Sequence, residues 1–91
     1  MAAVRLVISG RVQGVGFRAY VERQARRRAL RGWVRNRRDG TVETLLIGEE
    51  ALLREMEAFC HRGPAFAAVS RVERYAAEDE GIANFEQRPT E

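Results

Sequence analysis

A glycine-containing loop near the start of the chain holds the residues best suited to chemistry. The segment from Arg11 to Gly16 follows an apolar strand pattern and leads into a helical pattern that begins at Phe17. The N–H groups at a helix start lack intrahelical partners, and glycines let the backbone approach an anion closely. Arg18, in the first helical turn, adds a planar guanidinium that suits phosphate. The loop predicts a phosphate cradle, although a plain helix entry with a solvent-facing arginine stays open.

Two nucleotide-binding motifs have to be set aside. The run from Gly14 to Ala19 fits the G-x-G-x-x-A dinucleotide fingerprint. A chain of 91 residues has no room for the doubly wound domain that uses it, and about 20 residues further on it offers Asn36 and Asp39 instead of an acid that ends a parallel strand. A nucleotide-hydrolase loop is excluded as well, because the chain contains no Gly-Lys-Ser/Thr.

The elements that must position this loop follow from the hydrophobic periodicity. Apolar residues four apart predict a helix from Phe17 to Leu30, which Gly32 breaks, and a second apolar stripe predicts a helix from Glu49-Glu50 to Gly63-Pro64. Asp39-Gly40 predicts a hairpin turn between two strands. The predicted strands are Val4–Gly10, Trp33–Arg37, Thr41–Ile47, Ala67–Ala76 and the short Asn84–Arg88.

This order of elements predicts an α+β fold. Strand, helix, strand, strand, helix, strand is the ferredoxin-like split βαβ sandwich, here with a short additional C-terminal strand. Its sheet is mostly antiparallel, and both helices cover one face. A right-handed crossover through the first helix makes the first two strands parallel, so their carboxyl ends share one edge of the sheet. We therefore expect Asn36 to lie near the loop that follows Gly10.

The composition describes one small globular unit. Hydrophobic residues make up 45% and charged residues 32% of the 91 residues, which excludes a disordered or membrane-embedded chain. A chain this short builds a single core, so we expect residues 1–91 to form one domain. The net charge is +3, which favours an anionic partner without being a nucleic-acid signature.

The single cysteine gives information on the cellular compartment and on possible metal sites. Cys60 has no partner for an internal disulfide or for a cysteine-based metal site, which points to a reducing cytoplasm. The run Met1–Gly10 is interrupted by Arg5 and is too short for a signal-peptide core or a membrane span. We expect no metal, no cofactor and no membrane partner.

Several motifs carry a resemblance to a known family. The run Gly10–Arg18 is followed by Gly32–Asn36 and Asp39–Glu43, and the match continues through Val69–Glu73 to Asn84-Phe85. Together, at this spacing, these motifs resemble acylphosphatases over nearly the whole chain. The chain departs from the family's pattern where Arg37-Arg38 replaces a link that often contains proline, which affects the turn and not the site.

The resemblance implies an activity and a site. It implies hydrolysis of small acyl phosphates, without metal or cofactor, on a ferredoxin-like fold. Arg18 would bind the phosphate and Asn36 would orient the attacking water. The backbone amides that would cradle the phosphate are those of Gln13, Gly14, Val15, Gly16 and Phe17. If Arg18 and this loop form the cradle, we expect inorganic phosphate and sulfate to compete with the substrate, and we expect the protein to be a monomer.

The residues themselves are consistent with this chemistry. An acyl phosphate expels a carboxylate, which is already a stable anion, so no general acid is needed. Neutralising the phosphoryl charge and holding a water in line are tasks of electrostatics and positioning. Of the other candidates, Arg11 could assist anion capture. His61, Cys60, Trp33 and the run Arg26–Arg28 are better explained as helix-end, core or solvated residues.

Two non-enzymatic interpretations remain. The same architecture hosts RNA-binding modules, but these display stacking aromatics on their central strands, and Thr41–Ile47 has none. The other interpretation is an accessory domain of acylphosphatase type, such as a carbamoyl-transfer protein contains within a longer polypeptide. Activity of the isolated chain on a simple acyl phosphate distinguishes the enzyme from both.

Overall fold

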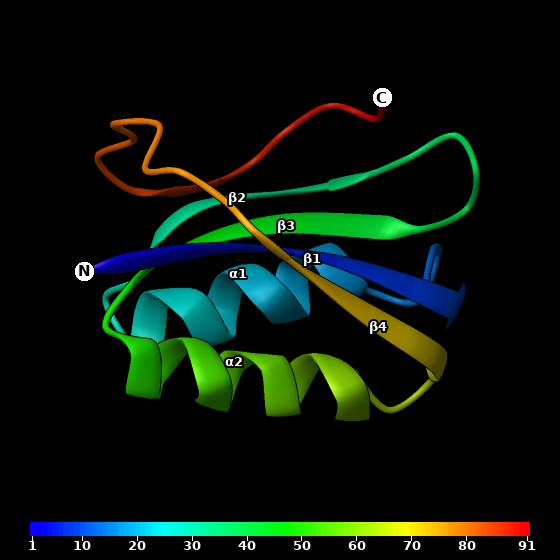
Figure 1. The fold of residues 1–91 in the computed structure, drawn as a ribbon. Helices are drawn as coiled ribbons and strands as arrows, with labels where there is room; N and C mark the ends of the chain where they lie inside the picture. The colour runs from blue at the N-terminus through cyan, green and yellow to red at the C-terminus, as the bar shows by residue number, and fades with distance from the viewer.

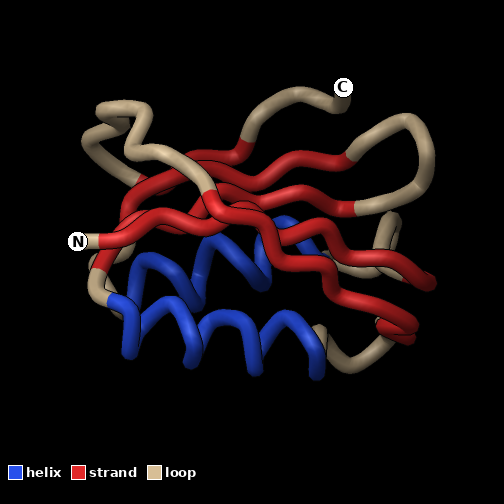
Figure 2. The backbone as a smooth tube through the Cα atoms, viewed as in Figure 1, coloured by secondary structure: helices blue, strands red, loops and turns tan.

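An open five-stranded sheet with two helices packed on one face makes up the structure, a computed structural model that describes residues 1–91 (Figures 1 and 2). Its elements in chain order are β1 (Ala2–Arg11), α1 (Phe17–Arg27), β2 (Arg31–Asn36), β3 (Val42–Gly48), α2 (Glu50–Arg62), β4 (Ala68–Ala76) and β5 (Phe85–Gln87). The strand order across the sheet is β4-β1-β3-β2-β5. This arrangement confirms the predicted ferredoxin-like α+β fold.

The pairing of the strands places the β1–α1 loop and the end of β2 at the same edge of the sheet. Both β1 and β2 pair antiparallel with β3, so they run in the same direction, as expected. Strand β5 pairs parallel with β2 and runs the same way. The carboxyl ends of these three strands therefore meet where β1 enters the loop to α1 and where β2 ends at Asn36.

The main core lies between the sheet and the helices. Alternate residues of β1 point toward the helices, and Leu6 and Ile8 are fully buried. On the helices, Phe17, Val21 and Leu53 pack against them in one apolar cluster. Burial of each such side chain contributes about 1.5–3 kcal/mol, so this cluster is what holds α1 and its N-terminus against the sheet.

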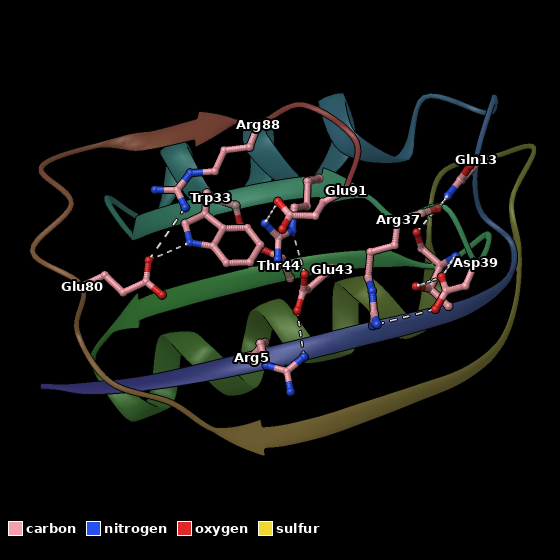
Figure 3. A network of polar contacts seen from close by, with 12 residues as sticks. Arg5, Gln13, Trp33, Arg37, Asp39, Glu43, Thr44, Glu80, Arg88 and Glu91 are labelled. Atoms are coloured by element: carbon pink, nitrogen blue, oxygen red, sulfur yellow. Dashed lines mark hydrogen bonds and ion pairs between the residues drawn. The ribbon is translucent and has the colours of Figure 1, made fainter.

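A second, smaller cluster lies on the face of the sheet away from the helices. Trp33 is buried there with Leu45 and Ile47, and the segment around Ile82 packs over them. The indole N–H of Trp33 donates to Glu80 (Figure 3). The Arg35 guanidinium lies 4.5 Å from the centre of the indole ring. Trp33 is therefore a packing residue, as expected, in a cluster separate from the main core.

The predicted end of the first helix is wrong. Helix α1 ends at Arg27, and Ala29 adopts a left-handed φ of 53°. The Leu30 N–H then donates to the Ala25 carbonyl at 3.0 Å, which is the bond of a Schellman cap with alanine in the position that glycine usually takes. Gly32, predicted to break the helix, lies inside β2, where a Cβ would stand 1.9 Å from the Leu45 carbonyl oxygen. Gly32 therefore lets β2 and β3 approach each other closely, and it does not end the helix.

The second helix follows the prediction closely. Helix α2 spans Glu50–Arg62 after Glu49, and Gly63 ends it at a φ of 69°. Met56 and Cys60 lie on its buried face. Neither this helix nor α1 is long and apolar enough to cross a membrane.

Candidate active site

A pocket of about 160 Å³ opens where the β1–α1 loop meets the ends of β2 and β5. We call it the loop pocket, and its lining residues are Val12, Gly14, Gly16, Phe17, Arg18, Ala19, Asn36 and Gln87. The structure thus brings together the two residues that the sequence singled out, Arg18 and Asn36. Of the predicted loop residues, Gly14, Gly16 and Phe17 line this pocket, whereas Gln13 and Val15 do not.

The backbone of the loop presents unpaired donors. Gly14 and Gly16 adopt left-handed φ angles of 73° and 80°, and a Cβ at either position would meet no atom within 4 Å. The first helical hydrogen bond runs from the Tyr20 N–H to the Gly16 carbonyl at 3.0 Å. The N–H groups from Gly14 to Ala19 donate to no other backbone carbonyl. A run of free amides at the positive end of a helix attracts an anion.

The charge of Arg18 is not compensated by the protein. Its side chain is half-buried, and it makes no ion pair or hydrogen bond with another residue, whereas Arg5, Arg31 and Arg35 are each paired with carboxylates. The first turn of α1 contains no acidic residue, and none lines the loop pocket. A guanidinium held without a carboxylate beside free helix amides is suited to a ligand with several negative oxygens.

The loop is anchored from two sides. Below it, Phe17 is buried in the main core and Val15 packs against the same cluster. Above it, the Gln13 side-chain amide donates to the carbonyls of Arg37 (2.7 Å) and Thr41 (2.9 Å), both in the β2–β3 turn (Figure 3). Gln13 was expected to act through its backbone N–H. The structure adds a different role, because its side chain ties the loop to the turn that follows Asn36.

Two carboxamide side chains line the loop pocket together with Arg18. Asn36 ends β2, and its side-chain amide has no partner within the protein, which leaves it free to both donate and accept. Gln87, on β5, was missed by the sequence analysis; its side-chain amide donates to Glu22 at 2.9 Å. No motif marks Gln87, because its position depends on a three-residue strand that pairs parallel with β2.

The weaker candidates lie elsewhere. Arg11 is exposed and does not line the loop pocket, and His61 is exposed at the end of α2. Cys60 is fully buried, and that burial raises the pKa of its thiol to about 12. A thiol that stays protonated in the core is not a nucleophile. Arg26 and Arg28 make hydrogen bonds and ion pairs with neighbouring residues at the end of α1.

The distribution of possible metal ligands is also informative. No group of three or more His, Cys, Asp or Glu side chains lies together in a way that could hold a metal ion. The polar groups of the loop pocket are backbone amides, one guanidinium and two carboxamides. Such a set consists mainly of donors, which suits an anion better than a cation.

Fold and pocket together define a ferredoxin-like α+β domain with a pocket suited to an anion. A family model described as acylphosphatase matches residues 4–87. The chain therefore belongs to the acylphosphatase family, and it is an enzyme of that class.

Individual relatives agree with this assignment. The acylphosphatase of Acidiphilium cryptum is 47% identical over 90 residues, which cover 99% of each chain. The crystal structure of acylphosphatase from Bacillus subtilis matches with a TM-score of 0.93 and 38% identity, over 97% of this chain and 99% of that one. HypF of T. kodakarensis contains a similar unit: its crystal structure matches at a TM-score of 0.85 and 30% identity, over 97% of this chain but 12% of its own.

Proposed function

We propose that this chain hydrolyses the carboxyl–phosphate bond of acyl phosphates, with Arg18 and the loop amides holding the phosphoryl group and Asn36 orienting the attacking water. The observation that carries the proposal is the composition of the loop pocket. An uncompensated guanidinium, a run of unpaired helix amides and a free carboxamide line one pocket in a member of this family.

The binding step follows from the charges. The phosphoryl oxygens accept hydrogen bonds from the amides between Gln13 and Phe17, among which Gly14 and Gly16 line the loop pocket. Arg18 supplies a planar fork of donors to the same oxygens. Because these donors are held in place before the substrate arrives, they stabilise the charge that develops in the transition state without reorganising.

The chemical step needs little beyond positioning. A water held by Asn36 attacks phosphorus in line with the acyl oxygen; a P–O bond to the water forms as the P–O bond to the acyl group breaks. The leaving carboxylate takes the electron pair of the broken bond. The attacking water gives its proton to a phosphoryl oxygen, since no Asp, Glu or His lines the loop pocket. The products are a carboxylate and inorganic phosphate.

A direct assay tests this function and its independence of metals. Purified protein should release phosphate from acetyl or benzoyl phosphate, and a chelator such as EDTA should leave the rate unchanged. The measurement is the initial rate of phosphate release with and without chelator, with added Mg²⁺ as a third arm. A rate that depends on Mg²⁺ contradicts the proposed mechanism, and no release from either substrate contradicts the proposed function.

HypF carries a similar unit within a longer chain, so a second candidate is that this chain also serves as an accessory domain. Hydrolysis by the 91-residue chain alone would show that it needs no further domain for the reaction. We further propose that residues 1–91 act as one monomeric domain and that inorganic phosphate and sulfate compete with the substrate. A cytoplasmic location is supported by the single, buried and unpaired Cys60.

A further inference from the structure

The chain continues past β5 along the edge of β2 and reaches Asn36. The Arg88 N–H donates to the Val34 carbonyl at 2.8 Å, and the Glu91 N–H donates to the Asn36 carbonyl at 3.1 Å. The Glu91 carbonyl in turn accepts from the Arg38 N–H at 2.9 Å. The backbone of Glu91 thus forms hydrogen bonds with Asn36, which carries the candidate side-chain amide, and with Arg38.

A row of charged side chains reinforces this contact on the face of the sheet away from the helices. The Glu91 carboxylate pairs with Arg35 at 2.9 Å, Arg35 pairs with Glu43 at 2.7 Å, and Glu43 pairs with Arg5 at 2.8 Å. Figure 3 shows Glu91, Glu43 and Arg5 in line across β2, β3 and β1. The row joins the segment Arg88–Glu91 to three neighbouring strands.

The backbone hydrogen bonds of Glu91 and the ion pair of its carboxylate differ in strength. The Glu91 side chain is 73% exposed, so its ion pair with Arg35 is screened by water and contributes little. The Glu43 side chain is only 7% exposed and is held by two arginines, which fixes Arg35 firmly. The main-chain bonds of Glu91 are therefore the stronger link to Asn36.

We propose that the segment Arg88–Glu91 is a positioning element for catalysis, in which Glu91 holds the backbone of Asn36 so that its amide stays aligned with the attacking water. The proposal rests on the proposed function of Asn36. Strand β5 itself pairs with β2 only as far as Val34, so Glu91 provides the contact on that side of Asn36, opposite its pairing with Val42 on β3. Because β2 ends at Asn36, a residue held on one side only would be free to shift.

Two substitutions at one position separate the two contacts. Glu91→Pro removes the N–H that donates to Asn36, and Glu91→Ala keeps that N–H but removes the carboxylate. We expect Glu91→Pro to lower kcat about tenfold, since small misplacements of reacting groups cost up to about 10²-fold. Glu91→Ala should have a much smaller effect. Neither should alter the inhibition constant of phosphate, because Arg18 and the loop amides are untouched.

The control is a variant that loses stability far from the loop pocket. Leu52→Ala removes a half-buried side chain of α2 that packs on the main core and does not line this pocket. It should lower Tm and leave kcat and the phosphate inhibition constant unchanged at 25 °C. A fall in kcat for Glu91→Pro but not for Leu52→Ala then reports positioning and not loss of stability.

The outcomes are distinct. A Glu91→Pro protein with the parent's kcat overturns the positioning role, as does one in which phosphate inhibition weakens along with kcat. Asn36→Ala, measured in the same assay, keeps the two proposals apart. If Asn36→Ala lowers kcat and Glu91→Pro does not, only the positioning role fails. If Asn36→Ala leaves kcat unchanged, there is no oriented water to position, and both proposals fail.

Discussion

Replacing Arg18 by alanine should abolish hydrolysis and, with it, the stabilisation of the fold by phosphate. Removing one preorganised donor from a developing negative charge costs about 10²–10³-fold in kcat, and Arg18 supplies both donors and charge, so we expect a loss at or beyond the upper end of that range. Phosphate at about 100 times its Kd adds about 2.7 kcal/mol to the free energy of unfolding of a protein that binds it. Thermal unfolding with and without phosphate should show this gain for the parent and not for the variant.

Two further variants make the Arg18 result specific. Arg18→Lys should recover little activity, because a single ammonium does not reproduce the planar fork. Arg23→Ala removes an exposed arginine from the same helix, one that makes no ion pair and does not line the loop pocket, and it should behave like the parent. Since Arg18 itself has no partner in the protein, Arg18→Ala should fold normally. A normally active Arg18→Ala protein contradicts the assignment.

Replacing Asn36 by alanine should lower kcat by about 10²-fold or more while leaving phosphate inhibition nearly intact. Asn36 carries no charge to attract phosphate, and its free amide can donate to and accept from a water. When an interaction is made mainly in the transition state, its removal lowers kcat and leaves ground-state binding unchanged. The measurement is a pair of steady-state profiles with phosphate inhibition constants for parent and variant.

The aspartate variant and a remote asparagine complete this test. Asn36→Asp keeps the shape but places a negative charge beside the phosphoryl oxygens, so it should weaken phosphate inhibition as well as kcat. Asn84→Ala changes an exposed asparagine outside the loop pocket and should have no effect. If Asn36→Ala weakens phosphate binding as much as Arg18→Ala while single-turnover chemistry stays fast, Asn36 is a substrate ligand and not the water-holding residue.

Local patterns were sufficient to predict the parts of the candidate site that lie close together in sequence. The strand-loop-helix pattern and the glycines predicted the loop from Arg11 to Gly16 and the place of Arg18 in the first helical turn. The position of Asn36 followed from topology, because a parallel relation between β1 and β2 brings their carboxyl ends to one edge. The order of elements and both helix starts followed from hydrophobic periodicity together with local turn and helix-start signals such as Asp39-Gly40 and Glu49-Glu50.

Contacts between distant segments could not be predicted in this way. Gln87 reaches the loop pocket through a short parallel strand, and Glu91 reaches Asn36 through the segment that follows it; neither carries apolar periodicity. The side-chain bonds from Gln13 to the β2–β3 turn depend on a distance that no sequence motif encodes. The end of α1 was misplaced because Ala29, a residue with no preference for a left-handed φ, takes the position usually given to glycine.

Titration with phosphate, followed residue by residue in ¹H–¹⁵N NMR spectra, tests most directly whether the loop amides hold the phosphoryl group. The amide signals of Gly14, Gly16 and Arg18 should shift most, because these N–H groups have no partner in the free protein and gain one from the anion. The shifts should saturate at the phosphate concentration that gives half-maximal competitive inhibition. Largest shifts outside the segment from Gln13 to Ala19, with the loop signals unmoved, would contradict the phosphate cradle.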